Sequence, residues 1–530
     1  MVILWPGGKM QQLFNVPVNQ LFAVEEKNAK PFKPVALSSS TIFKRIPSPL
    51  VFDHLQIQHN DFDRQPLLMS KASYSAPCFT SGDLNHDGLD DIVYAGSEGQ
   101  PAAIFLQQKN HTYISDPISS FEASRNQTGT DVCIFDANGD QLPDIYIASG
   151  GYHEYAAQDA LLNDRIYIND GKGKYEYHAD ALPAMPVSKG CVVTMDLTGD
   201  GHLDLFVGGR LIPGRYPECP ASYILINDGH GKFNDQTNQF AAEINNLGMV
   251  TDALACDING DKIQDLIVVG EWMPVTIFIQ EQGKLVNKTN DYFDSNYTGL
   301  WNTIGTADFN GDQKPDFIIG NLGTNAQLKA SASQPISLVY KDFDQNGSVD
   351  PLLNSFIQGK QYPYVTRDEL VKQLTYLKPR FNSFESYSDV NINDLFKKGE
   401  LADANTLQAS YLETSCFLSQ PNGKYKLGQL PVQAQFAPVH TVTIYDVDQD
   451  GSDDVLLCGN DSQMKIRLGK SDANYGVLLK GNGDGNFRYI PQIQSGLQVK
   501  GDVRCVIPLQ DGAFFFGINH LPSIVYKINN

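Results

Sequence analysis

A nine-residue pattern rich in aspartate occurs seven times along this chain and limits the folds that the chain can adopt. Each copy carries oxygen-bearing side chains at positions 1, 3, 5 and 9, and the copies begin at residues 83, 136, 196, 257, 308, 342 and 446. An apolar run of the kind found in β-strands follows each copy, as at residues 92–96 and 145–148. A motif that recurs in this way indicates a repeat architecture, in which each copy belongs to one structural unit.

The spacing predicts a calcium-binding loop in each copy. Oxygens on alternate residues of a tight loop can converge on one hard cation, and glycine at position 4 or 6 permits the positive φ that turns the chain back. An EF-hand is excluded because it needs Glu at position 12 and flanking helices, and position 12 here is occupied by Tyr94, Ile147, Val207 and Val268 in the first four copies. The cofactor expected is Ca²⁺, up to seven ions, with the ligands Asp83, Asn85, Asp87, Asp91, Asp136, Asn138, Asp140, Asp144, Asp196, Thr198, Asp200, Asp204, Asp257, Asn259, Asp261, Asp265, Asp308, Asn310, Asp312, Asp316, Asp342, Asp344, Asn346, Asp350, Asp446, Asp448, Asp450 and Asp454.

The charge of the chain agrees with this interpretation. Among 530 residues there are 61 acidic and 40 basic side chains, a formal net charge of −21, and 24 of the acidic residues lie inside the seven windows. Seven bound Ca²⁺ ions would bring the charge to about −7. A strongly negative chain is a poor partner for nucleic acid and for anionic lipid. No run of about 18 apolar residues is present, so we expect no transmembrane helix.

The segments between the loops predict β-hairpins. Residues 165–175 resemble residues 223–233, and both place Asn-Asp-Gly between alternating apolar positions. Each unit therefore consists of a strand, a calcium loop, a strand, a connection, a strand, a tight turn and a strand, which describes one β-propeller blade. The last unit, near residues 504–528, lacks its fourth strand, and we expect a strand from residues 41–57 to supply it and close the ring.

The fold class predicted is all-β, a seven-bladed β-propeller with a small helical insertion. Eight blades remain an alternative if the loops at 308 and 342, only 34 residues apart, belong to separate blades. The insertion is expected at about residues 358–410, because Thr366 and Glu369 form a capping-box pattern and Leu370, Leu374 and Leu377 follow at helical spacing. The eight cysteines show no Cys-x-x-Cys pair and are expected to be buried apolar residues, with one or two disulfides left open.

The repeats resemble the FG-GAP/VCBS repeats of integrin-α-like β-propellers over about residues 60–530, and residues 2–26 resemble the tail of an UnbV/ASPIC segment. This resemblance implies a partial UnbV/ASPIC-like segment at residues 1–30 and a calcium-binding propeller at residues 31–530. It also implies that the chain is part of a longer extracellular or bacterial cell-envelope protein, whose signal or lipoprotein sequence lies outside this chain. Calcium favours the same location, since weak loop sites with Kd of about 10⁻⁴ to 10⁻³ M fill only outside the cytosol.

The connections opposite the calcium loops carry the least repetitive residues. We predict that this face binds a glycan or a protein, and that its ligand contacts are Tyr152, His153, Arg210, Arg215, Trp272, Asn321 and Asn325. The alternative for Trp272 and the tyrosines is packing between blades.

The function predicted is non-catalytic binding or adhesion. The chain shows no Gly-x-Ser-x-Gly, His-Glu-x-x-His or phosphate-loop motif. One alternative is a calcium-assisted polysaccharide lyase or hydrolase, for which His153, with Tyr152 and Arg210, is the best candidate. Another is a structural scaffold domain of a larger surface protein.

Overall fold

The computed structural model describes residues 1–17, 21–32, 40–116, 119–397 and 399–529. The chain divides into two compact units, Met1–Thr41 and Ile42–Asn530. In the first unit, β1 (Val2–Trp5), β2 (Lys9–Gln12) and β3 (Lys30–Pro31) form an antiparallel sheet, and the short η1 (Glu26–Asn28) precedes β3. Residues 18–20 of the predicted UnbV/ASPIC-like segment and residue 398 of the predicted insertion lie outside the described residues, and the UnbV/ASPIC resemblance stays a prediction.

The second unit is built from antiparallel sheets that repeat one strand order. Seven such sheets are found among the described residues, and we number them first to seventh in chain order. Their strands are β5 (Phe79–Gly82), β6 (Asp91–Tyr94), β7 (Ala103–Gln107), β8 (Tyr113–Asp116); β9 (Thr128–Phe135), β10 (Asp144–Gly150), β11 (Arg165–Asn169), β12 (Tyr175–Tyr177); β13 (Ser188–Met195), β14 (Asp204–Leu211), β15 (Tyr223–Asn227), β16 (Phe233–Asp235); β17 (Met249–Cys256), β18 (Asp265–Pro274), β19 (Thr276–Glu281), β20 (Lys284–Asn287), with β21 (Thr298–Leu300) also paired to β18; β22 (Thr303–Ala307), β23 (Asp316–Gly320), β28 (Ser415–Ser419), β29 (Tyr425–Gly428); β30 (Val439–Tyr445), β31 (Asp454–Gly459), β32 (Val477–Gly481), β33 (Phe487–Ile490); and β34 (Val503–Pro508), β35 (Ala513–Ile518), β36 (Ile524–Ile528), β4 (Phe43–Ile46).

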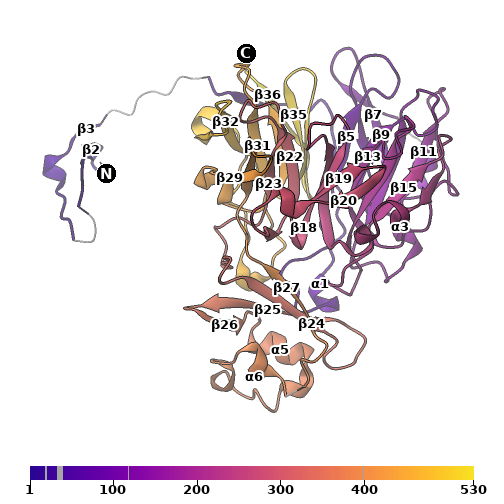
Figure 1. The fold of residues 1–530 in the computed structure, drawn as a ribbon. Helices are drawn as coiled ribbons and strands as arrows, with labels where there is room; N and C mark the ends of the chain where they lie inside the picture. The colour runs from indigo at the N-terminus through magenta and orange to yellow at the C-terminus, as the bar shows by residue number, and fades with distance from the viewer. Residues whose placement is uncertain (18–20, 33–39, 117–118, 398, 530) are drawn as a thin grey trace. The chain divides into compact units, whose positions relative to one another are not determined.

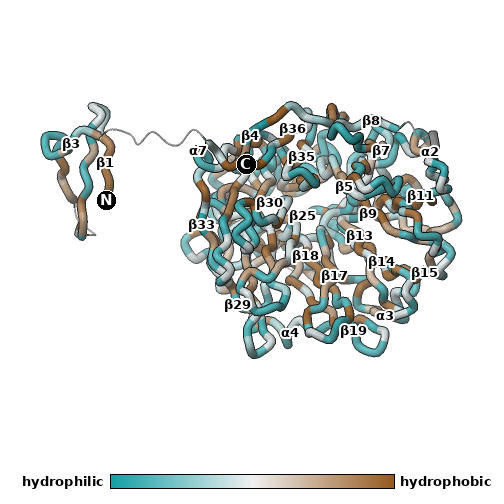
Figure 2. The backbone as a smooth tube through the Cα atoms, turned by 90° about the horizontal axis from the view of Figure 1, so that it is seen from above, coloured by the Kyte–Doolittle hydropathy of each residue, from teal (hydrophilic) through white to brown (hydrophobic). Residues whose placement is uncertain are grey.

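Apolar side chains fill the spaces between consecutive sheets. The second strands, such as β6 and β10, are buried along their whole length, because both faces of each sheet pack against a neighbour. One cluster joins the second and third sheets through Tyr146 and Leu205, and another joins the seventh and first sheets through Phe515 and Phe79. Figure 2 shows the sheets arranged around a centre lined by first strands such as β5, β9, β13 and β17.

The seventh sheet is completed from the other end of the chain, as predicted. β4 pairs with β36 in antiparallel register, with Phe43 opposite Ile528 and Ile46 opposite Val525. Phe43 is buried and meets the Phe514 ring edge-on at 5.3 Å between centroids. The pairing covers the backbone edge of β36 that would otherwise be exposed.

An insertion separates the second and third strands of the fifth sheet (Figure 1). It contains a further antiparallel sheet, in the order β26-β25-β24-β27, and four short helical segments. The elements are β24 (Ile336–Lys341), β25 (Asp350–Ile357), β26 (Lys360–Pro363), α5 (Arg367–Gln373), η4 (Thr375–Leu377), η5 (Glu385–Tyr387), α6 (Ile392–Leu395) and β27 (Asn405–Ala409).

The helical part of the insertion agrees with the sequence. The capping box forms between Thr366 and Glu369, and Leu370, Leu374 and Leu377 are buried. The insertion is larger than predicted, because it begins before residue 358 and also contains the four-stranded sheet that holds the sixth aspartate loop. Ile336 and Leu338 of β24 lie opposite residues of β27, about 70 residues further along the chain. A pairing between such distant segments leaves no local sequence signal.

The remaining helical segments are single turns: α1 (Asp61–Arg64), α2 (Ser119–Glu122), η2 (Ala160–Leu162), α3 (Thr237–Phe240), η3 (Ala242–Asn246), α4 (Thr289–Tyr292), η6 (Val432–Gln435), η7 (Ile466–Leu468) and α7 (Gln492–Ser495). Across the described residues, every helix is too short or too polar to cross a membrane. All eight cysteines lie in the described ranges and each is a free thiol, so the possible disulfides are not formed.

Candidate functional site

The seven aspartate loops share one backbone conformation. Six of the loops join the first strand of a main sheet to its second strand. The remaining loop, at residues 342–350, joins β24 to β25 in the insertion. Position 4 and position 6 have positive φ in every loop: His86, Gly88, Gly139, Gln141, Gly199, Gly201, Gly260, Lys262, Gly311, Gln313, Gln345, Gly347, Gln449 and Gly451. The turn thus needs two left-handed residues, and every loop has glycine at one of them or both.

The aspartate at position 1 fixes the inside of each loop. In the fourth loop, the Asp261 and Lys262 N–H groups donate to the two carboxylate oxygens of Asp257 at 3.1 and 2.8 Å. The position-6 N–H donates to the position-1 carboxylate in all seven loops. These bonds fold the backbone of each loop around its position-1 carboxylate.

The aspartate at position 9 ties each loop to the sheet beneath it. Asp265 accepts hydrogen bonds from the N–H of Ile258 in the loop and from the N–H of Gln280 on the third strand, both at 2.9 Å. The same two kinds of bond recur in the six main sheets that have a loop, whereas in the insertion Gln373 of α5 provides the second donor to Asp350. The sequence pattern did not reveal this structural role.

These position-9 carboxylates are buried, and within the described part of the chain none of them forms an ion pair. Burial, with a smaller contribution from the neighbouring loop aspartates, raises the pKa of Asp91, Asp144, Asp350 and Asp454 to about 6. Burial also raises the pKa of Asp204, Asp265 and Asp316. A cation in the loop would favour the ionised form that burial disfavours.

The donor set fits calcium. Carboxylate oxygens of Asp342, Asp344 and Asp350 lie within 4.8 Å of one another, as do those of Asp446, Asp448 and Asp454. All the converging side-chain donors are oxygens, which Ca²⁺ prefers. The seventh loop differs from the others in one respect, since Lys480 of β32 ion-pairs with Asp448 and, at 2.9 Å, with Asp450. This ammonium group offsets part of the negative charge there.

Three of the seven predicted ligand residues are buried. The Tyr152 hydroxyl bonds to Gln65, the Trp272 indole N–H donates to the Tyr216 hydroxyl at 2.7 Å, and the Asn321 amide donates to the Tyr411 carbonyl at 3.2 Å. These contacts give Tyr152, Trp272 and Asn321 a structural role.

The other four are more accessible but scattered. Arg215 pairs with Glu218, and Arg210 pairs with Glu271 at 2.9 Å. The His153 ring stacks on His59, and the Asn325 side-chain amide donates to the Phe436 carbonyl at 3.0 Å. Their ligand-binding role stays a prediction.

The segment from residue 57 to residue 75, which we call the crossing segment, covers much of the predicted ligand face. Arg64 donates to the His153 and Tyr155 carbonyls at 3.1 and 2.6 Å. Gln65 donates to the Tyr216 carbonyl at 3.0 Å and to the Val349 carbonyl of the insertion at 2.9 Å. The connections that the sequence left open to a ligand are therefore partly occupied by the chain itself.

A cavity of about 400 Å³ lies where the first strands meet, and Arg210 is one of its lining residues. Two aspartates in its wall join neighbouring sheets: Asp131 accepts from the Val192 N–H at 2.8 Å, and Asp252 accepts from the Ile304 N–H at 2.9 Å. Burial raises the pKa of Asp131 to about 7 and that of Asp252 to about 6. Sequence reasoning missed both, since each occurs in an ordinary strand pattern.

A second cavity, of about 450 Å³, lies between the insertion and the sixth sheet. It is lined by Asn325, Phe436, Lys470 and Asp472, among others. Apolar, amide and charged groups thus meet in one concave surface. Of the seven predicted ligand residues, Asn325 is the one placed here.

Comparison with known proteins identifies the repeats. Residues 83–147 and 257–319 match the sequence model of the FG-GAP-like repeat family. No curated protein matches the chain significantly.

Solved structures resemble the chain only distantly. The V. cholerae biofilm matrix protein Bap1 is 12% identical with a TM-score of 0.33, over 87% of this chain and 89% of its own. The extracellular domain of a B. thetaiotaomicron hybrid two-component system is 11% identical with a TM-score of 0.38, over 86% of this chain and 38% of its own. YCF48 bound to D1 peptide is 9% identical with a TM-score of 0.40, over 87% and 96%. The chain thus carries FG-GAP-like repeats in two stretches, which contain its first, second, fourth and fifth aspartate loops.

Proposed function

We propose that this chain is a calcium-stabilised, seven-bladed β-propeller that binds a glycan or protein ligand without catalysing a reaction. The observation that carries the proposal is the uniform structure of the seven loops, each with the same two left-handed positions, a position-1 carboxylate bonded to the position-6 N–H and a buried position-9 aspartate. Calcium bound there would neutralise the loop carboxylates and stabilise only the folded chain.

Seven blades are favoured over eight by the topology of the insertion. Its sheet has the order β26-β25-β24-β27, whereas the seven main sheets place their strands in blade order. It also interrupts the fifth sheet between β23 and β28 instead of following a completed sheet. Apolar clusters between the sixth and seventh sheets and between the seventh and first support a closed ring.

An extracellular or cell-envelope location, as part of a longer protein, belongs to the same proposal. Loop sites of this kind have calcium Kd values of about 10⁻⁴ to 10⁻³ M in extracellular modules, far above cytosolic calcium levels. The absence of paired cysteines among the described residues does not conflict with this location, because a large apolar core already stabilises the second unit.

The lyase or hydrolase alternative finds less support in the geometry. It requires His153, Tyr152 and Arg210 to face a common cleft, but Tyr152 is buried beneath the crossing segment and Arg210 pairs with Glu271. The binding function is therefore the one that we adopt.

The cavity of about 450 Å³ is the ligand site that we propose. Phe436 offers an aromatic surface, and Lys470 and Asp472 offer charged groups at the same opening, a combination that suits a sugar or a peptide. The test is an array of glycans and envelope proteins probed in calcium. We expect Phe436→Ala and Lys470→Ala to weaken binding of the identified ligand at least about 10-fold, since anchors of this kind contribute 1–2 kcal/mol or more.

The matched controls are Phe384→Ala and Lys426→Ala, two exposed residues outside this cavity. Ligand binding that is unchanged in the cavity variants, or equally weakened in the controls, would exclude this site.

A further inference from the structure

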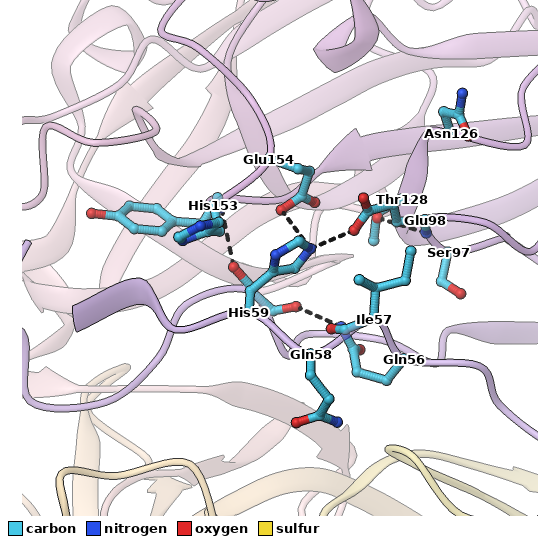
Figure 3. A network of polar contacts seen from close by, with 12 residues as sticks. Gln56, Ile57, Gln58, His59, Ser97, Glu98, Asn126, Thr128, His153 and Glu154 are labelled. Atoms are coloured by element: carbon cyan, nitrogen blue, oxygen red, sulfur yellow. Dashed lines mark hydrogen bonds and ion pairs between the residues drawn. The ribbon is translucent and has the colours of Figure 1, made fainter. Parts of the chain in front are cut away.

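Three metal-ligating side chains meet at a place that the calcium loops do not account for. His59 lies in the crossing segment, Glu98 in the connection between β6 and β7, and Glu154 in the connection between β10 and β11. Figure 3 shows the two carboxylates converging on the His59 ring. The His59 Nε2 atom is 2.6 Å from Glu98 Oε2 and 3.7 Å from Glu154 Oε2, and the ligand atoms of all three lie within 4.8 Å of one another.

One carboxylate oxygen in this cluster has no hydrogen-bond partner. Glu154 Oε2 is buried and unsatisfied, although it points toward the imidazole. The hydrogen bond at 2.6 Å accounts for only one of the two carboxylates, because His59 Nε2 carries at most one proton. Burial and the nearby Glu98 charge raise the pKa of Glu154 to about 7. A buried, unpartnered carboxylate is unfavourable unless something else balances it.

In the part of the chain that the structure describes, the neighbouring side chains do not balance this charge. His153 stacks on His59 with ring centroids 4.9 Å apart, but its Nδ1 atom faces Asp61 Oδ1 at 3.5 Å. Asp61 is itself occupied by the Ala72 and Ser73 N–H groups and by the Ser73 hydroxyl. Among the described residues, Glu98 and Glu154 form ion pairs with His59 alone.

We propose that His59, Glu98 and Glu154 form a site for a borderline divalent transition metal of the zinc class. Imidazole nitrogen and carboxylate oxygen are both ligands that Zn²⁺ takes in proteins, whereas Ca²⁺ takes oxygen donors only. Zn²⁺ ligands lie about 2.0–2.2 Å from the ion, so atoms spaced as these are can surround one ion after small rotamer shifts. Binding through Nε2 requires the neutral His59 tautomer that carries its proton on Nδ1, and the two carboxylates bind in their ionised form.

The site is open to solvent on one side. The side chains of His59, Glu98 and Glu154 are 15%, 22% and 14% exposed, so a metal held by three protein ligands keeps a position for water or for a ligand group. Because the three residues come from the crossing segment and from the first two sheets, the metal would also fix the crossing segment to the ring.

The test uses the full chain, stripped with chelator and then supplied with about 1 mM Ca²⁺ to fill the acidic loops. Zn²⁺ is titrated by calorimetry, and Co²⁺ is followed by its visible absorption, which reports nitrogen and oxygen ligands. We expect one Zn²⁺ equivalent in the unmodified chain. His59→Gln and Glu154→Gln should each weaken it at least about 100-fold, since loss of a mere supporting contact already costs 10–100-fold.

Glu98→Gln is the mildest variant, because Glu98 is the most exposed of the three, and it keeps the test valid if another variant unfolds. Its melting curve in calcium should match that of the unmodified chain within a few degrees. The controls are Glu176→Gln and His178→Gln, exposed residues at β12. Failure to bind Zn²⁺ in calcium, or equal binding by the ligand variants and the controls, would overturn the site whatever the outcome for calcium.

Discussion

Deleting residues 1–47, and with them β4, is expected to abolish cooperative melting of the second unit and to cause aggregation. The deletion removes every backbone hydrogen bond between β4 and β36 and leaves β36 as an open strand edge. It also removes Phe43, which is 1% exposed and lies in the cluster between the sixth and seventh sheets. Size-exclusion chromatography and a thermal melt measure both effects.

Single substitutions separate the core contribution from the strand edge. Phe43→Ala should cost about 3–5 kcal/mol while the chain remains folded, as for other buried phenylalanines. Lys44→Ala, at an exposed position of the same strand, should change stability by less than about 0.5 kcal/mol. A deleted chain that stays monomeric and melts like the full chain would show that β4 does not close the fold.

Replacing the position-9 aspartate of the fourth loop is expected to give the largest effect of any single change in the loops. Asp265→Ala leaves the N–H groups of Ile258 and Gln280 buried without partners. Each orphaned donor costs about 1–3 kcal/mol, so we expect a loss of about 2–6 kcal/mol both with calcium and in chelator. Urea denaturation followed by intrinsic fluorescence measures this loss.

The comparison variant changes a loop residue that is exposed to solvent and that we propose as a calcium ligand. Asp261→Asn at position 5 keeps an oxygen on the loop but removes one negative charge. We expect it to lower stability in calcium by about 1 kcal/mol and to have little effect in chelator, because its N–H partner can bond to water. If both variants lose stability only when calcium is present, then Asp265 acts as a metal ligand and not as a structural link.

The loop turns and the pairing of β4 with β36 could be predicted because their signals are local or periodic. Seven copies in one register predict the turns. The last unit lacks a fourth strand after β36, and this gap predicts that a strand such as β4 supplies it. The structural role of Asp265 could not be predicted, since its partner Gln280 is fixed only when the third strand pairs.

The opposite face could not be predicted for the same physical reason. Tyr152 occurs in a connection that looks exposed in sequence, but Gln65 of the crossing segment packs over it. His59, Glu98 and Glu154 come from three separate segments without periodic spacing, so only the folded chain places them together. Interactions between distant segments leave little trace in a single sequence.

Thermal melting of the full chain in calcium and in excess chelator tests the central claim most directly. At 10 to 100 times Kd, each ion bound only to the folded state contributes about 1.4–2.7 kcal/mol, and several loops act together. We therefore expect chelation to lower Tm by at least about 10 °C, and calcium, but not an equal concentration of magnesium, to restore it. A melting curve that is the same in calcium and in excess chelator would contradict calcium-stabilised loops.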